Sequence, residues 1–145
     1  MSQYAELADL VIYGLPVNSL GSLTTTQQTD ALIAASSQID SYLRGRYPMP
    51  LLAWGIEVTK ACCVLAAFDL MNIRGYNPAS GADRNLMDRA DRITLWLRDV
   101  QKGAAHPDVT ISPPESEKSQ YTQPQVVSRS VVDLATGATG SCRGW

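Results

Sequence analysis

The stretch IDSYLRGRYPMPL, residues 39–51, decides the fold because it holds both the end of a helix and the cause of that end. A proline pushes the residue before it out of helical backbone, and it lacks the amide hydrogen that a helix needs. Pro48 and Pro50 therefore stop a helix that arrives from the N-terminal side. We expect residues 47–52 to form a stiff, extended connection to the next element.

A regular helical pattern leads into this stretch. Side chains that share one helical face recur every three or four residues: Leu32, Ala35, Ile39, Tyr42 and Arg46, with Leu43 beside them. At the start of the pattern, Thr24 or Thr25 is followed three residues later by Gln27 or Gln28, which is the spacing of a capping box. The pattern predicts an amphipathic helix over residues 26–46, with Ile39, Tyr42 and Leu43 buried near its end.

Residues 56–73 differ from that helix because they are apolar on nearly every side. A surface helix shows a single apolar stripe, whereas a helix that is apolar all round is covered by its neighbours. We therefore expect this segment to be the central helix. Its most apolar part, residues 61–70, is interrupted by Asp69 and is too short to span a bilayer.

The clearest helical period lies between Ser80 and Gly103, which are a plausible N-cap and a plausible stop. The apolar residues of this segment alternate between spacings of four and three: Leu86, Ala90, Ile93, Leu97 and Val100. Its opposite face carries Arg84, Asp88 and Arg92 at successive steps of four, so that neighbouring charges have opposite signs.

The two ends of the chain carry weaker signals. Spacing of apolar residues predicts a short helix capped by Ser2 and ending near Gly14, followed by a loop. Residues 104–145 are rich in Pro, Ser, Thr, Gly and Gln and show no helical period, which predicts an extended tail. Short apolar runs in the tail favour one strand or hairpin: Val126, Val127, Val131 and Val132. The expected fold is all-α, a small bundle of about four helices (residues 1–103) with an extended tail (residues 104–145).

Composition excludes several classes of protein. The net charge of −2 and the pI of about 5.2 argue against a dedicated nucleic-acid binder, which usually has a basic face. Three cysteines without regular spacing do not form a disulfide framework. The N-terminal residues lack the basic start of a signal peptide, so we expect a protein made in the cytoplasm, without a membrane partner.

No group of residues has the pattern of an active site. His106 stands alone, without nearby metal-ligating side chains, and we interpret it as a surface residue. Cys62 and Cys63 lie in an apolar segment that raises thiol pKa values, so we interpret them as core residues. We therefore predict no enzyme, no catalytic residue, no metal and no cofactor.

Residues 39–43 and 46–51 resemble the signature of the Mu-like phage head–tail connector, or adaptor, family. The residues that carry the resemblance, all interpreted as packing residues, are Ile39, Asp40, Tyr42, Leu43, Arg46, Tyr47, Pro48 and Pro50. The opening Tyr4 and Asp9–Leu10, and the helix that ends at Gly103, are also similar to the family. The resemblance covers about residues 2–103 and leaves the tail outside. Ser41 stands where the family usually has glycine, and Met49 where leucine is common.

The resemblance implies a structural subunit of the virion neck. Such proteins form a ring, commonly of twelve copies, beneath the portal protein. The ring extends the DNA channel, so that DNA is only passing cargo, and it offers a surface to head-closure or tail-terminator proteins. We expect Asp40 and Arg46, which do not face each other on one helix, to pair elsewhere, even across a subunit boundary.

We predict the two interfaces of such a ring from residues outside the signature. The face formed by Arg84, Asp88 and Arg92 is the expected contact between copies. The tail is the expected contact with the portal, through residues 120–134 and 141–145. Its candidate docking residues are Val126, Val127, Val131, Val132 and the aromatic Trp145.

Two alternatives stay open. Another phage head or tail completion protein would share the same surroundings, and a β-barrel body would favour a closure protein. A helix-turn-helix DNA-binding regulator would need a short turn between two helices and a basic recognition helix. The proline linker and the acidic pI count against that second alternative.

Overall fold

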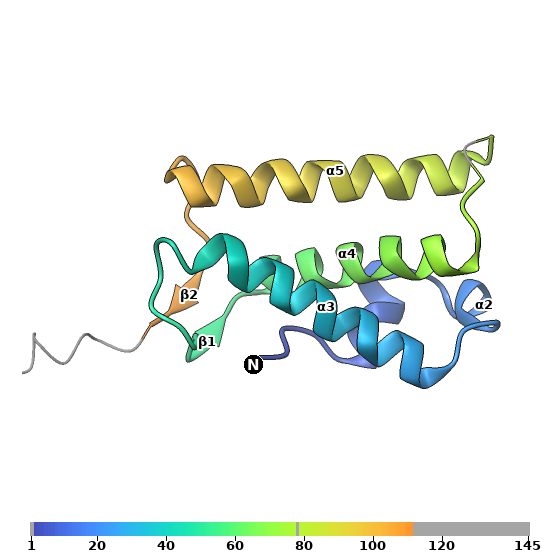
Figure 1. The fold of residues 1–145 in the computed structure, drawn as a ribbon, viewed down its shortest axis with the longest axis horizontal. Helices are drawn as coiled ribbons and strands as arrows, with labels where there is room; N and C mark the ends of the chain where they lie inside the picture. Colours follow the sequence, from blue (N-terminus) through green and yellow to red (C-terminus); the bar gives the residue numbers. More distant parts are fainter. Residues whose placement is uncertain (1, 78, 112–145) are drawn as a thin grey trace, which may run out of the picture. The chain divides into compact units, whose positions relative to one another are not determined.

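The computed structural model of the chain describes residues 2–77 and 79–111. Within them the chain is mostly helical, with one pair of short antiparallel strands (Figure 1). The elements in chain order are α1 (Leu7–Asp9), the π-helix η1 (Leu10–Gly14), α2 (Val17–Leu20), α3 (Thr25–Leu43), β1 (Ala53–Trp54), α4 (Ile56–Arg74), α5 (Gly81–Lys102) and β2 (Val109–Thr110). The predicted fold class is confirmed.

Helix α3 begins as its sequence predicts. Thr24 is the N-cap, and its side chain accepts a hydrogen bond from the backbone N–H of Gln27. The Gln27 side chain in turn accepts one from the backbone N–H of Thr24, which completes a capping box. The helix ends at Leu43 and not at Arg46, because the backbone N–H of Arg46 bonds to the Leu43 carbonyl three residues back, which departs from the four-residue pattern of an α-helix.

Helix α4 is the central helix, as predicted. It contacts α3, α5 and η1, so most of its sides are covered (Figure 1). Cys62 and Cys63 are both fully buried in the core that these elements share, as expected of small apolar residues. Burial raises the pKa of both thiols, to about 12 for Cys63, because the charged thiolate is poorly solvated there.

Helix α5 packs its predicted stripe against that core. The buried residues are Leu86, Ala90, Leu97 and Val100, and Ile93 and Trp96 are partly buried beside them. Ser80 is the N-cap residue but makes no side-chain capping hydrogen bond, and the Asp83 carboxylate accepts instead from the backbone N–H of Asn77 in the preceding loop. The helix stops at Gly103, which adopts the left-handed conformation with φ of 87°.

The N-terminal segment departs from its prediction. Ser2 does not cap a helix: helix α1 starts after Glu6, whose backbone N–H donates to the Asp9 carboxylate in a capping box. Tyr4 lies ahead of the helix and is buried. The expected loop after Gly14 contains the short helix α2, which buries Leu20. Apolar spacing found the helical turns here, but it missed where the chain first enters the core.

Strands β1 and β2 pair antiparallel, with Ala53 opposite Thr110 and Trp54 opposite Val109. The chain therefore returns to the helical body after α5, and one compact unit spans Met1–Ser112. The strand or hairpin expected at Val126, Val127, Val131 and Val132 lies outside the described residues, as does Trp145.

Candidate interaction surface

The signature residues of the sequence form internal contacts. Ile39 and Leu43 are fully buried, and Tyr42 and Tyr47 pack against the core from its edge. Pro48 and Pro50 are exposed on the connection to β1. The signature thus fixes how α3 ends and how the chain reaches α4.

Asp40 accepts a hydrogen bond from the hydroxyl of Tyr4, the first buried residue among those that the structure describes. The backbone carbonyl of Tyr4 accepts from the Trp54 indole N–H at 3.2 Å and from the Thr59 hydroxyl at 3.1 Å. The Tyr4 backbone N–H donates to Ser36 Oγ at 3.2 Å. These bonds tie the N-terminal segment to α3, β1 and α4 at once.

Arg46 reaches the C-terminal end of α5. Its guanidinium Nη1 lies 3.4 Å from the backbone carbonyl oxygen of Val100, and the group covers Gly103. A cation at this end of a helix interacts favourably with the unpaired carbonyls and the helix dipole. Asp40 and Arg46 therefore both find partners within the chain, and their contacts give no support to pairing across a subunit boundary.

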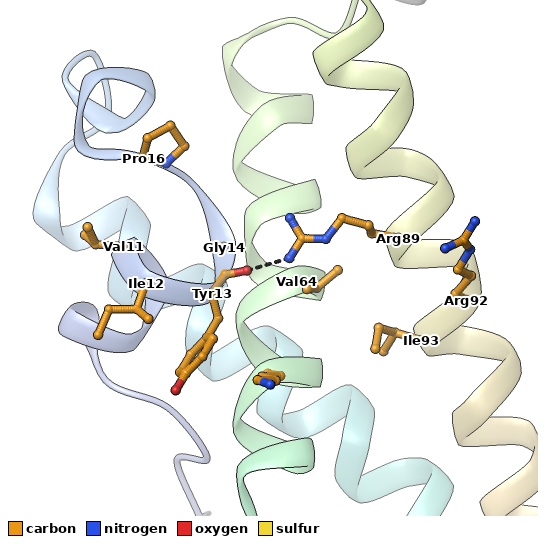
Figure 2. Close-up of a pocket in the computed structure, with 10 residues that line it drawn as sticks. Val11, Ile12, Tyr13, Gly14, Pro16, Val64, Arg89, Arg92 and Ile93 are labelled. Carbon is orange, nitrogen blue, oxygen red and sulfur yellow. Dashed lines mark hydrogen bonds between the residues drawn. The ribbon is translucent and has the colours of Figure 1, made fainter.

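An apolar groove with a volume of about 580 Å³ opens between η1 and α5, with α4 as its floor (Figure 2). We call it the η1–α5 groove. It is lined by Val11, Ile12, Tyr13, Gly14 and Pro16 from the N-terminal side, Lys60 and Val64 from α4, and Arg89, Arg92 and Ile93 from α5. Ile12, which lines this groove, is 69% exposed.

Basic side chains edge the groove. Arg89 crosses it from α5 and donates a hydrogen bond to the backbone carbonyl of Tyr13 at 2.7 Å (Figure 2). The Lys60 ammonium lies 5.4 Å from the centre of the Tyr13 ring, within range of a cation–π interaction. No acidic side chain lines the groove in the part of the chain that the structure describes. The groove therefore suits an apolar partner surface with negative charge at its edge.

The π-helix η1 shapes the N-terminal wall of this groove. The backbone N–H of Leu15 donates to the carbonyl of Leu10, five residues back, which widens the turn. Gly14 then lies so close to α4 that a Cβ atom there would be 3.0 Å from the carbonyl oxygen of Cys63. Leu10 points into the core, whereas Val11 and Ile12 are left exposed. Short π-helical turns are frequent at functional sites.

The structure divides the face expected to join copies of the chain. Arg84, Asp88 and Arg92 are all exposed on α5, as their spacing predicts. Only Arg92 lines the η1–α5 groove. Arg84 and Asp88 line a separate hollow of about 400 Å³ with Tyr76 and Met87. The role of all three in an interface stays a prediction.

Sequence reasoning missed the N-terminal wall of the groove. The predicted short helix that ends near Gly14 includes Val11 and Ile12, and the apolar side of such a helix would be buried. Two adjacent apolar residues beside the buried Leu10 cannot all face one core on a helix, because neighbours lie about 100° apart. The run of apolar residues before Gly14 was therefore the sequence signal that some of them would be exposed.

The described residues offer little for chemistry. No group of three or more metal-ligating side chains occurs among residues 2–77 and 79–111. His106 is exposed, as expected, and the buried thiols have raised pKa values. None of the helices in this part of the chain has the length and apolar character needed to cross a bilayer.

A family model with the description "Bacteriophage Mu, Gp36" matches residues 4–128. The chain belongs to the bacteriophage Mu Gp36 family. The match includes both the Tyr4 segment and the signature around Asp40, which the fold joins by a hydrogen bond. It also runs past Gly103, where the resemblance seen in the sequence was expected to stop. A comparison with curated proteins gave no match.

Membership of the Gp36 family makes this chain a phage protein. The family region includes residues 104–111, which bring β2 back to β1, and continues into the segment beyond them. The tail as far as residue 128 therefore lies inside the family match. It covers Val126 and Val127 but neither Val131, Val132 nor Trp145.

Proposed function

We propose that this protein is a structural subunit of the neck of a tailed phage. Copies of it form a ring, commonly twelve, that joins the portal protein to head-closure or tail-terminator proteins and extends the DNA channel. The observation that carries the proposal is the Gp36 family match over residues 4–128. The residues that resemble the connector signature all lie inside that match.

The surface of the helical body supports a role in assembly. The chain has only 18% charged residues, below the usual quarter, which fits a protein that covers part of its surface with partners. The η1–α5 groove exposes Ile12 next to a basic edge. An apolar groove with basic residues at its edge is typical of a surface that a partner protein covers.

The tail is the proposed contact with the portal. It contains apolar pairs, Val126–Val127 and Val131–Val132, and ends at Trp145, an aromatic side chain suited to anchor an interface. An extended segment gains backbone hydrogen bonds when it adds to the edge of a partner's sheet. Repetition around a ring adds avidity to each weak contact.

The small number of potentially catalytic side chains in the described residues also favours a structural role. In the described part of the chain the single histidine is exposed at the end of the body, and the two thiols are buried with raised pKa values. Among these residues no group of three or more His, Cys, Asp or Glu side chains could hold a metal ion. We therefore propose that the protein acts by binding and not by catalysis, with no cofactor.

The two alternatives differ in what they require. A head or tail completion protein of another kind remains compatible with the phage family and with a helical body. A helix-turn-helix regulator requires a short turn between its two helices, but residues 44–55, including β1, separate α3 from α4. Its recognition helix would also be basic, whereas α5 alternates acidic and basic residues.

Mass photometry of the chain, alone and mixed with the portal protein from the same genome, tests the proposal. We expect the portal ring to gain a fixed multiple of the chain's mass. A variant that ends at Ser112 keeps β2 and the whole compact unit, and it should add less mass or none. If the chain never binds portal but retards a DNA duplex at physiological salt, the regulator alternative replaces this proposal.

A further inference from the structure

The η1–α5 groove and helix α3 lie on opposite sides of α4. Lys60 and Val64, one helical turn apart, line the groove. Cys62 lies between them in sequence and points toward α3, with its Sγ 3.4 Å from Ser36 Oγ and 3.6 Å from the Leu32 carbonyl oxygen. Two residues along a helix correspond to a rotation of about 200°. The groove and the outer face of α3 therefore point in nearly opposite directions.

The outer face of α3 has a composition unlike that of the groove. Ile33 is 42% exposed there, and Ala34 and Ser37 beside it are small and exposed. Asp30 is exposed one turn earlier on the same face. Helix α3 contains no lysine or arginine. This face is thus partly apolar and negative, and its Ile33 borders a hollow of about 290 Å³ with Ser2 and Gln3, whereas the groove is concave, apolar and edged by Lys60, Arg89 and Arg92.

We infer that the outer face of α3 of one copy packs into the η1–α5 groove of the next copy. Ile33 enters the apolar floor, the small Ala34 and Ser37 let the helix come close, and Asp30 meets the basic edge. This inference rests on the proposed ring, and it names the two surfaces that join neighbouring subunits. Of the three residues expected at the contact between copies, the inferred interface contains Arg92. It also contains the N-terminal wall of the groove and the outer face of α3.

Symmetry and charge favour α3 of the next copy as the occupant of the groove. The alternative, in which the grooves of two copies face each other, is less favourable. A ring is closed by a head-to-tail contact between two different surfaces, and these surfaces must lie on different sides of each subunit. The groove and α3 satisfy that requirement. Two grooves facing each other would bring cations together without a carboxylate from either lining, which is unfavourable when the contact excludes water.

Disulfide cross-linking between variants that each carry one introduced, exposed cysteine tests the inference. In a Cys142→Ser background, one batch carries Ile12→Cys and the other carries Ala34→Cys; both positions are exposed. Cys62 and Cys63 stay in place because they are fully buried. The mixture is assembled on the portal and then oxidised. A Gln101→Cys batch, exposed on α5 but away from the groove, replaces the Ala34→Cys batch as the matched control.

We expect a covalent dimer in the mixture of Ile12→Cys with Ala34→Cys, and none with Gln101→Cys. A dimer formed by Ile12→Cys alone would overturn the inference, because it would show groove facing groove. A ring that assembles on the portal without any Ile12–Ala34 cross-link also overturns it, while the proposed function stands. If no ring forms on the portal with the unmodified chain, the proposed function fails first, and this inference with it.

A charge reversal supplies an independent test. Arg92→Asp alone and Asp30→Arg alone should each weaken addition to the portal ring by at least about tenfold, because each places like charges at the contact. The double variant Arg92→Asp/Asp30→Arg should recover most of that loss. Circular dichroism confirms that each exposed substitution leaves the fold intact. Equal loss in the single and double variants would contradict the pairing.

Discussion

The Tyr4 hydroxyl donates a hydrogen bond to the Asp40 carboxylate, and this contact joins positions 36 residues apart. Burial is the main cause that raises the pKa of Tyr4, and the bond to Asp40 raises it further, so the hydroxyl stays protonated as the donor. The Tyr4 ring meets the Trp54 ring edge to face, with centres 4.9 Å apart at 86°. The first segment of the chain therefore holds α3 and the strand pair in place.

Tyr4→Phe removes the hydroxyl but keeps the ring against Trp54. We expect the free energy of unfolding to fall by about 0.5–1.5 kcal/mol, the typical net value of one hydrogen bond. Urea denaturation measures it. Combined with Asp40→Ala, the loss should be clearly less than additive, because both changes remove the same bond. Tyr76→Phe removes a hydroxyl that donates to Met87 Sδ in an exposed setting, so this control should change little.

Gly14→Ala tests how closely η1 packs on α4. The new Cβ would lie 2.9 Å from Leu10 Cδ1 and 3.0 Å from the Cys63 carbonyl oxygen, and a helix backbone cannot easily move away. We expect a loss of about 1–3 kcal/mol in the free energy of unfolding, as for other overpacked sites. Gly45→Ala, where nothing lies within 4 Å, is the matched control. Equal thermal stability of both variants would contradict the close approach.

Gly103→Ala tests the junction between α5 and the return to β2. Gly103 has φ of 87°, which costs an alanine about 1–2 kcal/mol, and the Arg46 guanidinium fills the space beside it. We expect a lower melting temperature and faster proteolysis after residue 103. Gly81→Ala, which meets nothing within 4 Å in the first turn of α5, should be neutral or slightly stabilising. If Arg46→Ala rescued Gly103→Ala fully, crowding by Arg46 and not backbone strain would be the cause.

The sequence predicted the three long helices because each has an independent local signal. Thr24 and Gln27 form the predicted capping box, residues 56–73 lack a polar side, and Gly103 ends α5. These signals act within one or two helical turns, so no knowledge of the tertiary structure is needed. The exception was the end of α3, where the chain turns at Leu43 before the prolines come into effect.

What the sequence could not predict depends on contacts between distant residues. Tyr4 is buried where Asp40, Trp54 and Ser36 form hydrogen bonds with it. No local sequence pattern reveals these distant partners. Strands of two residues, such as β1 and β2, are too short to show alternation. The η1–α5 groove likewise exists because Gly14 lets η1 approach α4, and a π-helical turn has no distinct periodicity in so short a segment.

Asp69 makes stability depend on pH in a predictable direction. It lies on α4, partly buried, and desolvation raises its pKa above the ordinary value of 3.8 because the ionised form is poorly solvated. Between 3.8 and the raised pKa, the folded chain keeps the Asp69 proton while the unfolded chain loses it. The contribution of Asp69 to stability therefore falls as pH rises through that window, and it stays lower above it.

Asp69→Asn removes this penalty, since the amide stays neutral at every pH. We expect the variant to be more stable than the unmodified chain at pH 7, with the difference shrinking as pH falls toward 3.8. Melting temperatures measured across that range give the comparison. Asp91→Asn, exposed on α5, controls for the loss of one negative charge. A destabilised Asp69→Asn variant at pH 7 would mean that the Asp69 carboxylate has a favourable partner and that desolvation does not dominate its environment.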